Sequence, residues 1–278
     1  MDYFDKAETW DRATLETVQL ARLKTTIQQA SRAPFYAKRL AEAGVSADNL
    51  RSLEDIRRIP FTSKDDLRSQ YPYGLATVPH SEFVRMHCSS GTTGTPVAVC
   101  YTQPDINSWA DLMARCLYMA GVRKDDVFQN MSGYGLFTGG LGIHFGAERL
   151  GCMTIPAGAG NSKRQLKLVK DFGTTVAHIL PSYALHLGTT LIEEGEDPKA
   201  LSLRIACVGA EPYTEETRRR IEALFDMKVY NSYGLSEMNG PGVAFECQYQ
   251  NGLHLWEDAY LLEIIDPNTG KLVPDGEV

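Results

Sequence analysis

From Phe83 onward, short apolar runs alternate with longer amphipathic segments. This alternation predicts an α/β fold, with a mostly parallel sheet and helices on both of its faces. The expected strands are residues 83–88, 97–101, 127–130, 152–155, 175–180, 203–208 and 228–231, and the expected helices are 105–119, 140–150, 162–172, 183–194 and 214–224. Ligands of such sheets bind beyond the carboxyl ends of the strands. Polar, glycine-rich turns are expected at that edge, at residues 131–140, 209–212 and 232–239.

The segments on either side of this region have a different texture. Residues 1–80 are expected to be helical and to carry no site chemistry, with helices over 11–30, capped by Asp11, over 35–43, and from 62–66 onward. After residue 252 the chain becomes strand-rich, with an apolar run at 261–265 before a turn at 266–270, and it ends as if inside a hairpin. We therefore expect a helical region at 1–80, an α/β core at 81–245, and the cut start of a β-rich subdomain at 246–278.

The composition excludes several classes of protein. The chain has 278 residues, 43% of them hydrophobic, and a net charge of −7, which argues against a nucleic-acid partner. The N-terminus lacks the basic and apolar regions of a signal peptide, and no apolar stretch is long enough to span a membrane. The six cysteines are scattered, as is typical of reduced thiols rather than a disulfide framework. These features predict a cytoplasmic protein without a membrane partner, and they leave a homodimer open.

The segment from Ser89 to Pro96, S-S-G-T-T-G-T-P, has no apolar period that a helix or strand could bury. It lies between two expected strands, so it should form a hairpin tip. Its backbone N–H groups and hydroxyls can line one concavity, which is the kind of surface that binds phosphate oxygens. The alternative is a flexible Ser/Thr/Gly turn. The chain has no P-loop, no G-x-G-x-x-G fingerprint and no G-x-S-x-G elbow, so nucleotide binding would depend on this loop and other partners.

A second candidate segment, N-S-Y-G-L-S-E, spans residues 231–237 after an expected strand. Its aromatic ring can stack on a base, and a carboxylate that faces phosphates requires a cation between them. The alternative is an ordinary turn with a solvated glutamate.

Together, S-S-G-T-T-G-T-P and, about 140 residues later, Y-G-L-S-E resemble the adenylate-forming superfamily of acyl-CoA synthetases and luciferases. Within it, the chain is most similar to phenylacetate–CoA ligases. The likeness covers nearly the whole chain, including A-P-F-Y-A-K-R-L-A-E-A-G-V at 33–45, S-L-E-D-I-R-R-I-P-F-T-S-K-D-D-L at 52–67 and Y-P-Y-G-L at 71–75. Val97 replaces the lysine of most superfamily phosphate loops, as is usual in the phenylacetate branch.

The resemblance implies the large N-terminal domain of these enzymes and a set of site residues. ATP would contact Ser89, Ser90, Gly91, Thr92, Thr93, Gly94, Gly209, Ala210, Glu211, Pro212, Asn231, Ser232, Tyr233 and Gly234, with the loop at 89–94 on the phosphates and Tyr233 stacked on adenine. The catalytic candidates are Glu237, as the Mg²⁺ ligand, Ser236 and Thr92. The acyl pocket would include Tyr134, Phe137, Gly139 and Gly140. The ribose-binding motif, the hinge and the C-terminal domain with its catalytic lysine would lie beyond Val278.

The implied activity is ATP-dependent activation of an aryl acid as an acyl-adenylate, followed by transfer to coenzyme A. Neither step needs a nucleophilic side chain, which agrees with the lack of a Ser-His or Cys-His constellation. An acyl-adenylating protein with another acceptor would share every motif. A nucleotide- or acyl-binding module without turnover is the third alternative.

The remaining histidines and cysteines carry weaker signals. His87, His144, His178 and His186 lie in or beside apolar runs and are expected to be core or supporting residues, and Cys88 a small buried residue. Cys247 and His254 flank a short polar turn and would supply half of a zinc site. The resemblance suggests a Cys-x-Cys pair beyond Val278 as the other half. The alternative is a buried cysteine and a surface histidine.

Overall fold

The computed structural model describes residues 3–89, 94–274 and 276, and it has the expected mixed α/β architecture. A seven-stranded sheet has the order β4-β3-β5-β6-β7-β8-β9. Its first five strands in this order are parallel, and the pairs β7–β8 and β8–β9 are antiparallel. The strands of this sheet are β3 (Val127–Asn130), β4 (Met153–Ile155), β5 (Val176–His178), β6 (Ile205–Val208), β7 (Lys228–Leu235), β8 (Gly240–Glu246) and β9 (Leu253–Leu255).

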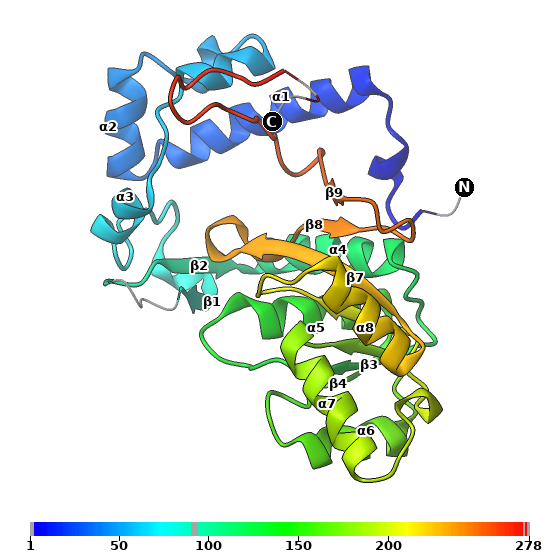
Figure 1. Cartoon of the computed structure of the whole chain (residues 1–278). Helices are drawn as coiled ribbons and strands as arrows, with labels where there is room; N and C mark the ends of the chain where they lie inside the picture. The colour runs from blue at the N-terminus through cyan, green and yellow to red at the C-terminus, as the bar shows by residue number, and fades with distance from the viewer. Residues whose placement is uncertain (1–2, 90–93, 275, 277–278) are drawn as a thin grey trace.

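Helices cover both faces of the sheet (Figure 1). α4 (Gln103–Met119) and α5 (Thr138–Leu150) pack on one face, and α6 (Ser162–Phe172), α7 (Pro181–Glu193) and α8 (Glu215–Phe225) on the other. Alternate strand residues point into the two cores because side chains alternate along a strand. Val176 and Cys207 belong to the core under α4 and α5, whereas Ala177 and Ala206 belong to the core under α7 and α8.

The N-terminal region is helical, as predicted. It contains α1 (Arg12–Ala30), α2 (Pro34–Glu42), α3 (Lys64–Ser69) and short 3₁₀ helices at Lys6–Thr9, Ala47–Asn49, Leu53–Arg58 and His80–Glu82. Asp11 caps α1 by accepting a hydrogen bond from the Thr14 N–H at 2.8 Å. The C-terminal segment returns to this region (Figure 1), where the Glu257 carbonyl accepts from Gln19 and Glu263 pairs with Arg57.

A separate antiparallel hairpin lies in the chain between the N-terminal helical region and the α/β region. β1 (Phe83–Cys88) pairs with β2 (Ala98–Thr102), as the sequence predicts for the strands that flank the loop at Ser89–Pro96. Ser89 closes the base of this loop, because its N–H donates to the Val97 carbonyl and its Oγ accepts from the Val97 N–H, both at 2.9 Å. Ser90, Gly91, Thr92 and Thr93 lie outside the described residues.

Two expectations about the C-terminal third are wrong. Residues 232–235 continue β7 rather than form a turn, because they pair with β8, a strand that the sequence did not indicate. The apolar run at 261–265 forms no strand; among the described residues it makes a single bridge, Ile265 to Leu272. Without a partner strand, Leu262 and Ile264 remain 60% and 57% exposed. Within the described ranges, no helix combines the length and hydrophobicity needed to cross a membrane.

Candidate functional site

A cavity of about 880 Å³ opens at the carboxyl ends of the parallel strands, where the sequence predicts a ligand. Among the segments that it brings together are three that are far apart in the chain: the turn after β3, the turn after β6, and the second half of β7. The predicted site residues among its lining are Phe137, Gly139, Gly140, Gly209, Ala210, Glu211, Pro212, Asn231, Ser232, Tyr233, Gly234 and Ser236.

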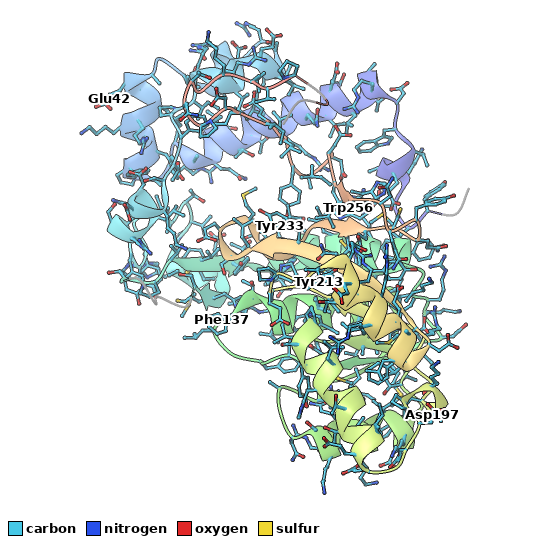
Figure 2. The ribbon with its side chains drawn as sticks, in the orientation of Figure 1. Glu42, Phe137, Asp197, Tyr213, Tyr233 and Trp256 are labelled. Carbon is cyan, nitrogen blue, oxygen red and sulfur yellow. The ribbon has the colours of Figure 1, made fainter. Side chains whose placement is uncertain are left out.

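Two aromatic rings on this lining are open to a ligand. Phe137, on the loop before α5, is 57% exposed, and Tyr233, on β7, is 51% exposed. Figure 2 labels both side chains and shows the two elements that carry them. Such half-exposed rings offer flat apolar surface for an aromatic ligand.

The turn after β6 is held in an unusual conformation. A Cβ on Gly209 would lie 2.6 Å from the Ser232 carbonyl oxygen, so only glycine lets β6 and β7 approach this closely. Ala210 follows with φ of +66°, a left-handed conformation that non-glycine residues seldom adopt. The Glu211 carboxylate accepts hydrogen bonds from the Ser182 N–H at 2.6 Å and the Ser182 Oγ at 3.1 Å. Glu211 therefore fixes the turn to the first turn of α7.

A hydrogen-bond network lies beneath the turn after β3. The Asn130 Nδ2 donates to the Gly140 carbonyl at 2.7 Å and to the Tyr134 hydroxyl at 2.8 Å. The Tyr134 hydroxyl also contacts His144 Nδ1 at 3.1 Å. Tyr134 is not among the cavity-lining residues, and burial raises the pKa of its hydroxyl to about 12. The Tyr134 hydroxyl therefore supports the turn through Asn130 and His144, and the place of Tyr134 in the acyl pocket stays a prediction.

His178, expected to be a core or supporting residue, lines the cavity. It is 6% exposed, and burial lowers the pKa of its imidazole to about 4. Its Nδ1 lies 2.9 Å from Asn130 Oδ1 and 3.2 Å from Ser132 Oγ. His87 is also buried, with Nδ1 3.1 Å from the Leu136 carbonyl oxygen, but it does not line this cavity. His186, in contrast, is exposed on α7.

Ser236 and Glu237 face different spaces, although they are adjacent in sequence. Ser236 lines the main cavity, and Glu237 lines a second cavity, of about 520 Å³, between the helical region and β2. The Glu237 carboxylate lies 3.8 Å from Lys64 Nζ, at the start of α3. The helical region thus contributes a cationic side chain near this carboxylate, which the sequence did not indicate.

A buried ion pair fixes the middle of β7 at Asn231, and sequence reasoning missed it. Glu246, on β8, accepts two hydrogen bonds from Arg218, on α8, at 2.6 and 2.8 Å. The same carboxylate accepts from the Asn231 N–H at 2.6 Å. Both charged residues are at most 5% exposed. No sequence signal pairs these two positions, since they are 28 residues apart on different elements.

The predicted zinc ligands remain a prediction. Cys247 is half-buried after β8, and His254 is exposed on β9. Over residues 3–89, 94–274 and 276, no three or more His, Cys, Asp or Glu side chains form a group that could hold a metal. All six cysteines are free, as the sequence predicts.

Comparison with known proteins agrees with this geometry. A phenylacetate-coenzyme A ligase from Pseudomonas putida is 48% identical over 276 residues, covering 99% of this chain, and one from Thermus thermophilus is 46% identical over 280 residues. The chain spans 63% of the length of each of these relatives. The solved structure of a 2-hydroxyisobutyryl-CoA ligase in complex with 2-HIB-AMP and CoA has a TM-score of 0.91 and 32% identity, covering 98% of this chain and 60% of that one. The model of the AMP-binding enzyme family matches residues 14–278, and the chain belongs to this family.

Proposed function

We propose that this chain forms the nucleotide- and acid-binding part of an AMP-forming ligase that activates an aryl acid and transfers it to coenzyme A. The observation that carries the proposal is the cavity at the strand ends, which is lined by two of the segments assigned to ATP, 209–212 and 231–234, and by the segment assigned to the acid. The resemblance to phenylacetate-coenzyme A ligases, at 44–48% identity, supports the choice of reaction.

The chemistry needs positioning more than it needs reactive side chains. A carboxylate is a poor electrophile, so its oxygen attacks the α-phosphorus of ATP, forming a mixed anhydride with AMP and releasing pyrophosphate. A thiol then displaces AMP to give the thioester. Holding the acid and the α-phosphate in line converts a bimolecular step into an effectively unimolecular one. The turn at Gly209 would border the ligand, and Tyr233 would stack on the base.

The residues around Glu237 fit a magnesium ion that arrives with the nucleotide. Mg²⁺ usually keeps several waters and takes one or two carboxylates together with substrate phosphates, so a dedicated cluster of protein ligands is not needed. The Glu237 side chain is 21% exposed and has Lys64 as a partner at 3.8 Å, a distance too long for a tight hydrogen bond. When bound, the ion would neutralise phosphate charge. Ser236 would contact phosphate from the main cavity.

The acid end of the cavity is expected near Phe137. Gly139, Gly140 and Ile143 follow Phe137 in the chain and line the same cavity, and none of them carries a charge. This lining favours the burial of an aromatic ring over a short aliphatic chain, although apolar pockets discriminate weakly per methylene.

Calorimetric titration of the chain with ATP and Mg²⁺ tests the assignment. Tyr233→Ala should weaken ATP binding roughly 5- to 150-fold, because stacking of a base on an aromatic ring contributes about 1–3 kcal/mol. Tyr249→Ala is the matched control, since Tyr249 is 89% exposed and does not line the cavity. No measurable binding of ATP to the unmodified chain, or equal affinities in the two variants, would overturn the proposal.

A further inference from the structure

The orientation of the Asn130 amide is fixed by its neighbours. The Gly140 carbonyl can only accept, so the amide nitrogen of Asn130 must face it, at 2.7 Å. The Ser132 backbone N–H can only donate, so the amide oxygen must face Ser132, at 3.2 Å. The two contacts agree on one orientation. Asn130 Oδ1 is therefore the atom that lies 2.9 Å from His178 Nδ1.

This orientation determines the tautomer of His178. Because Asn130 Oδ1 has no hydrogen, His178 Nδ1 must carry the proton and donate. A neutral imidazole has one N–H, so the Nε2 atom has a free lone pair and is a hydrogen-bond acceptor. The Ser132 hydroxyl fits the same pattern, since it donates to Asn130 Oδ1 at 3.0 Å and its oxygen lies 3.2 Å from the His178 Nδ1 atom, from which it can accept.

Among the described residues His178 Nε2 has no hydrogen-bond partner, and it is not one of the fully buried side-chain atoms without a partner, so it is open to the main cavity that His178 lines. A ligand that covers this acceptor without supplying a donor costs it the hydrogen bond that it can make to water, so a ligand that supplies a donor there is favoured over one that does not. The low pKa of the imidazole, near 4, keeps Nε2 an acceptor at neutral pH.

Deepening the proposed function, and depending on it, we propose that the acid bound in this cavity carries a hydroxyl or amino group that donates a hydrogen bond to His178 Nε2. The acid is favoured over the nucleotide as the source of this donor because His178 is held by residues next to the turn that carries Phe137. Its two partners, Asn130 and Ser132, belong to β3 and the turn after it, and that turn continues to Phe137 at the acid end. A hydroxyphenylacetate-like acid has the required chemistry.

Acid binding to the 278-residue chain in the presence of AMP tests the proposal by calorimetry. The probes are phenylacetate, its 2-, 3- and 4-hydroxy derivatives, and the corresponding methoxy derivatives, which keep the oxygen but cannot donate. We expect one hydroxy acid to bind about tenfold tighter than phenylacetate and than its own methoxy derivative, the effect of one buried hydrogen bond. Equal affinities for all hydroxy, methoxy and unsubstituted acids would overturn the proposal, and this comparison needs no variant.

His178→Phe keeps a ring of similar size and removes the acceptor. In this variant the preference for the hydroxy acid over phenylacetate and over the methoxy derivative should disappear. His186→Phe is the matched control, because His186 is exposed on α7 and should leave the preference unchanged. A preference that survives His178→Phe would overturn the proposal.

A nucleotide arm distinguishes the other source of a donor. AMP is compared with the analogue that lacks the exocyclic amino group, in the unmodified chain and in His178→Phe. If His178→Phe removes the preference for the amino group of AMP and leaves acid selectivity unchanged, His178 contacts the base, and the acid assignment is wrong. If neither AMP nor any acid binds, the proposed function itself fails, which is a different result from equal affinities among acids that do bind.

Discussion

The buried pair of Glu246 and Arg218 should stabilise the fold and hold the middle of β7 at Asn231, and its removal gives the most decisive prediction. Glu246→Gln keeps the shape of the side chain but removes its charge. In the wild-type chain three donors, the Asn231 N–H and two Arg218 nitrogens, lie 2.6–2.8 Å from the Glu246 carboxylate. The single amide oxygen of glutamine cannot accept from all three. Arg218, 5% exposed, would lose its main counter-charge.

Removing one partner of a buried pair typically costs about 3–5 kcal/mol, because the other charge stays buried. Glu215 lies 3.0 Å from Arg218 and retains part of the compensation, so the lower end, about 3 kcal/mol, is expected for Glu246→Gln. At roughly 2–4 °C per kcal/mol, the melting temperature should fall by about 6–12 °C. Glu215→Gln is the control, and it should cost less than about 1 kcal/mol because the Glu215 side chain is 65% exposed.

Urea and thermal unfolding of the two variants measure the difference. The double variant Arg218→Met/Glu246→Leu should recover most of the lost stability, since buried pairs are often replaced by apolar residues without net cost. It should still bind ATP more weakly than the unmodified chain, because the Asn231 N–H has lost its acceptor. A loss below about 1 kcal/mol in Glu246→Gln would refute the reasoning about this pair.

Four further outcomes are expected. Gly142→Ala should lower the free energy of unfolding by about 1–3 kcal/mol, because a Cβ there would overlap the Trp109 ring, whereas Gly139→Ala, with nothing within 4 Å, should change it little in thermal unfolding. Glu237→Gln should reduce acid-dependent pyrophosphate exchange by roughly 2–4 kcal/mol of transition-state stabilisation, and unchanged exchange would exclude its metal role. Lowering the pH from 6.5 to 5 should destabilise the fold by about 2 kcal/mol through His178. The reason is that its imidazole, with a pKa of about 4, stays neutral in the folded chain but is protonated in the unfolded chain. The free energy of unfolding of His178→Phe, measured with urea over a pH series, should therefore depend less on pH. Residues 1–278 alone should form acyl-CoA very slowly in a coupled thioester assay, and robust synthesis would contradict that expectation.

The sequence predicts elements well where a local period is enough. The helix expected at residues 162–172 matches α6 (Ser162–Phe172), and the run at 127–130 matches β3 (Val127–Asn130). Helix starts are local too, as the Asp11 cap of α1 illustrates. In each case the residues that specify the element lie within or next to it.

Strands whose existence depends on a distant partner could not be predicted in the same way. Ser232 and Gly234 have the composition of a turn, yet they belong to β7 because β8 supplies the ladder on one side. The apolar run at 261–265 has the composition of a strand, yet it has only the bridge from Ile265 to Leu272 among the described residues. In both segments the local composition gives the wrong prediction, because a strand forms only where a partner strand is available for pairing.

The candidate site shows the same division at the level of single side chains. Three of the segments that line the cavity, at 131–140, 209–212 and 232–239, could be predicted, because the carboxyl ends of parallel strands meet at one edge. The roles within it could not, as Tyr134 and His178 illustrate. The Tyr134 hydroxyl is occupied by Asn130 and His144 and does not line the cavity, while His178 does. Which face of a strand or turn meets the cavity depends on partners that sequence spacing does not specify.

Strand register explains why the polar residues of the site converge. Asn130 on β3 pairs in register with His178 on β5, and Val208 on the neighbouring strand β6 pairs in register with Asn231 on β7. At the carboxyl ends of these strands the ladder stops, so the side chains there must satisfy polar groups that no further backbone pairing can reach. Asn130 and Ser132 do so with one another and with one nitrogen of His178. That closed network leaves the second nitrogen of His178 for whatever occupies the cavity, so the same hydrogen bonds that complete the sheet also determine the chemistry it offers to a ligand.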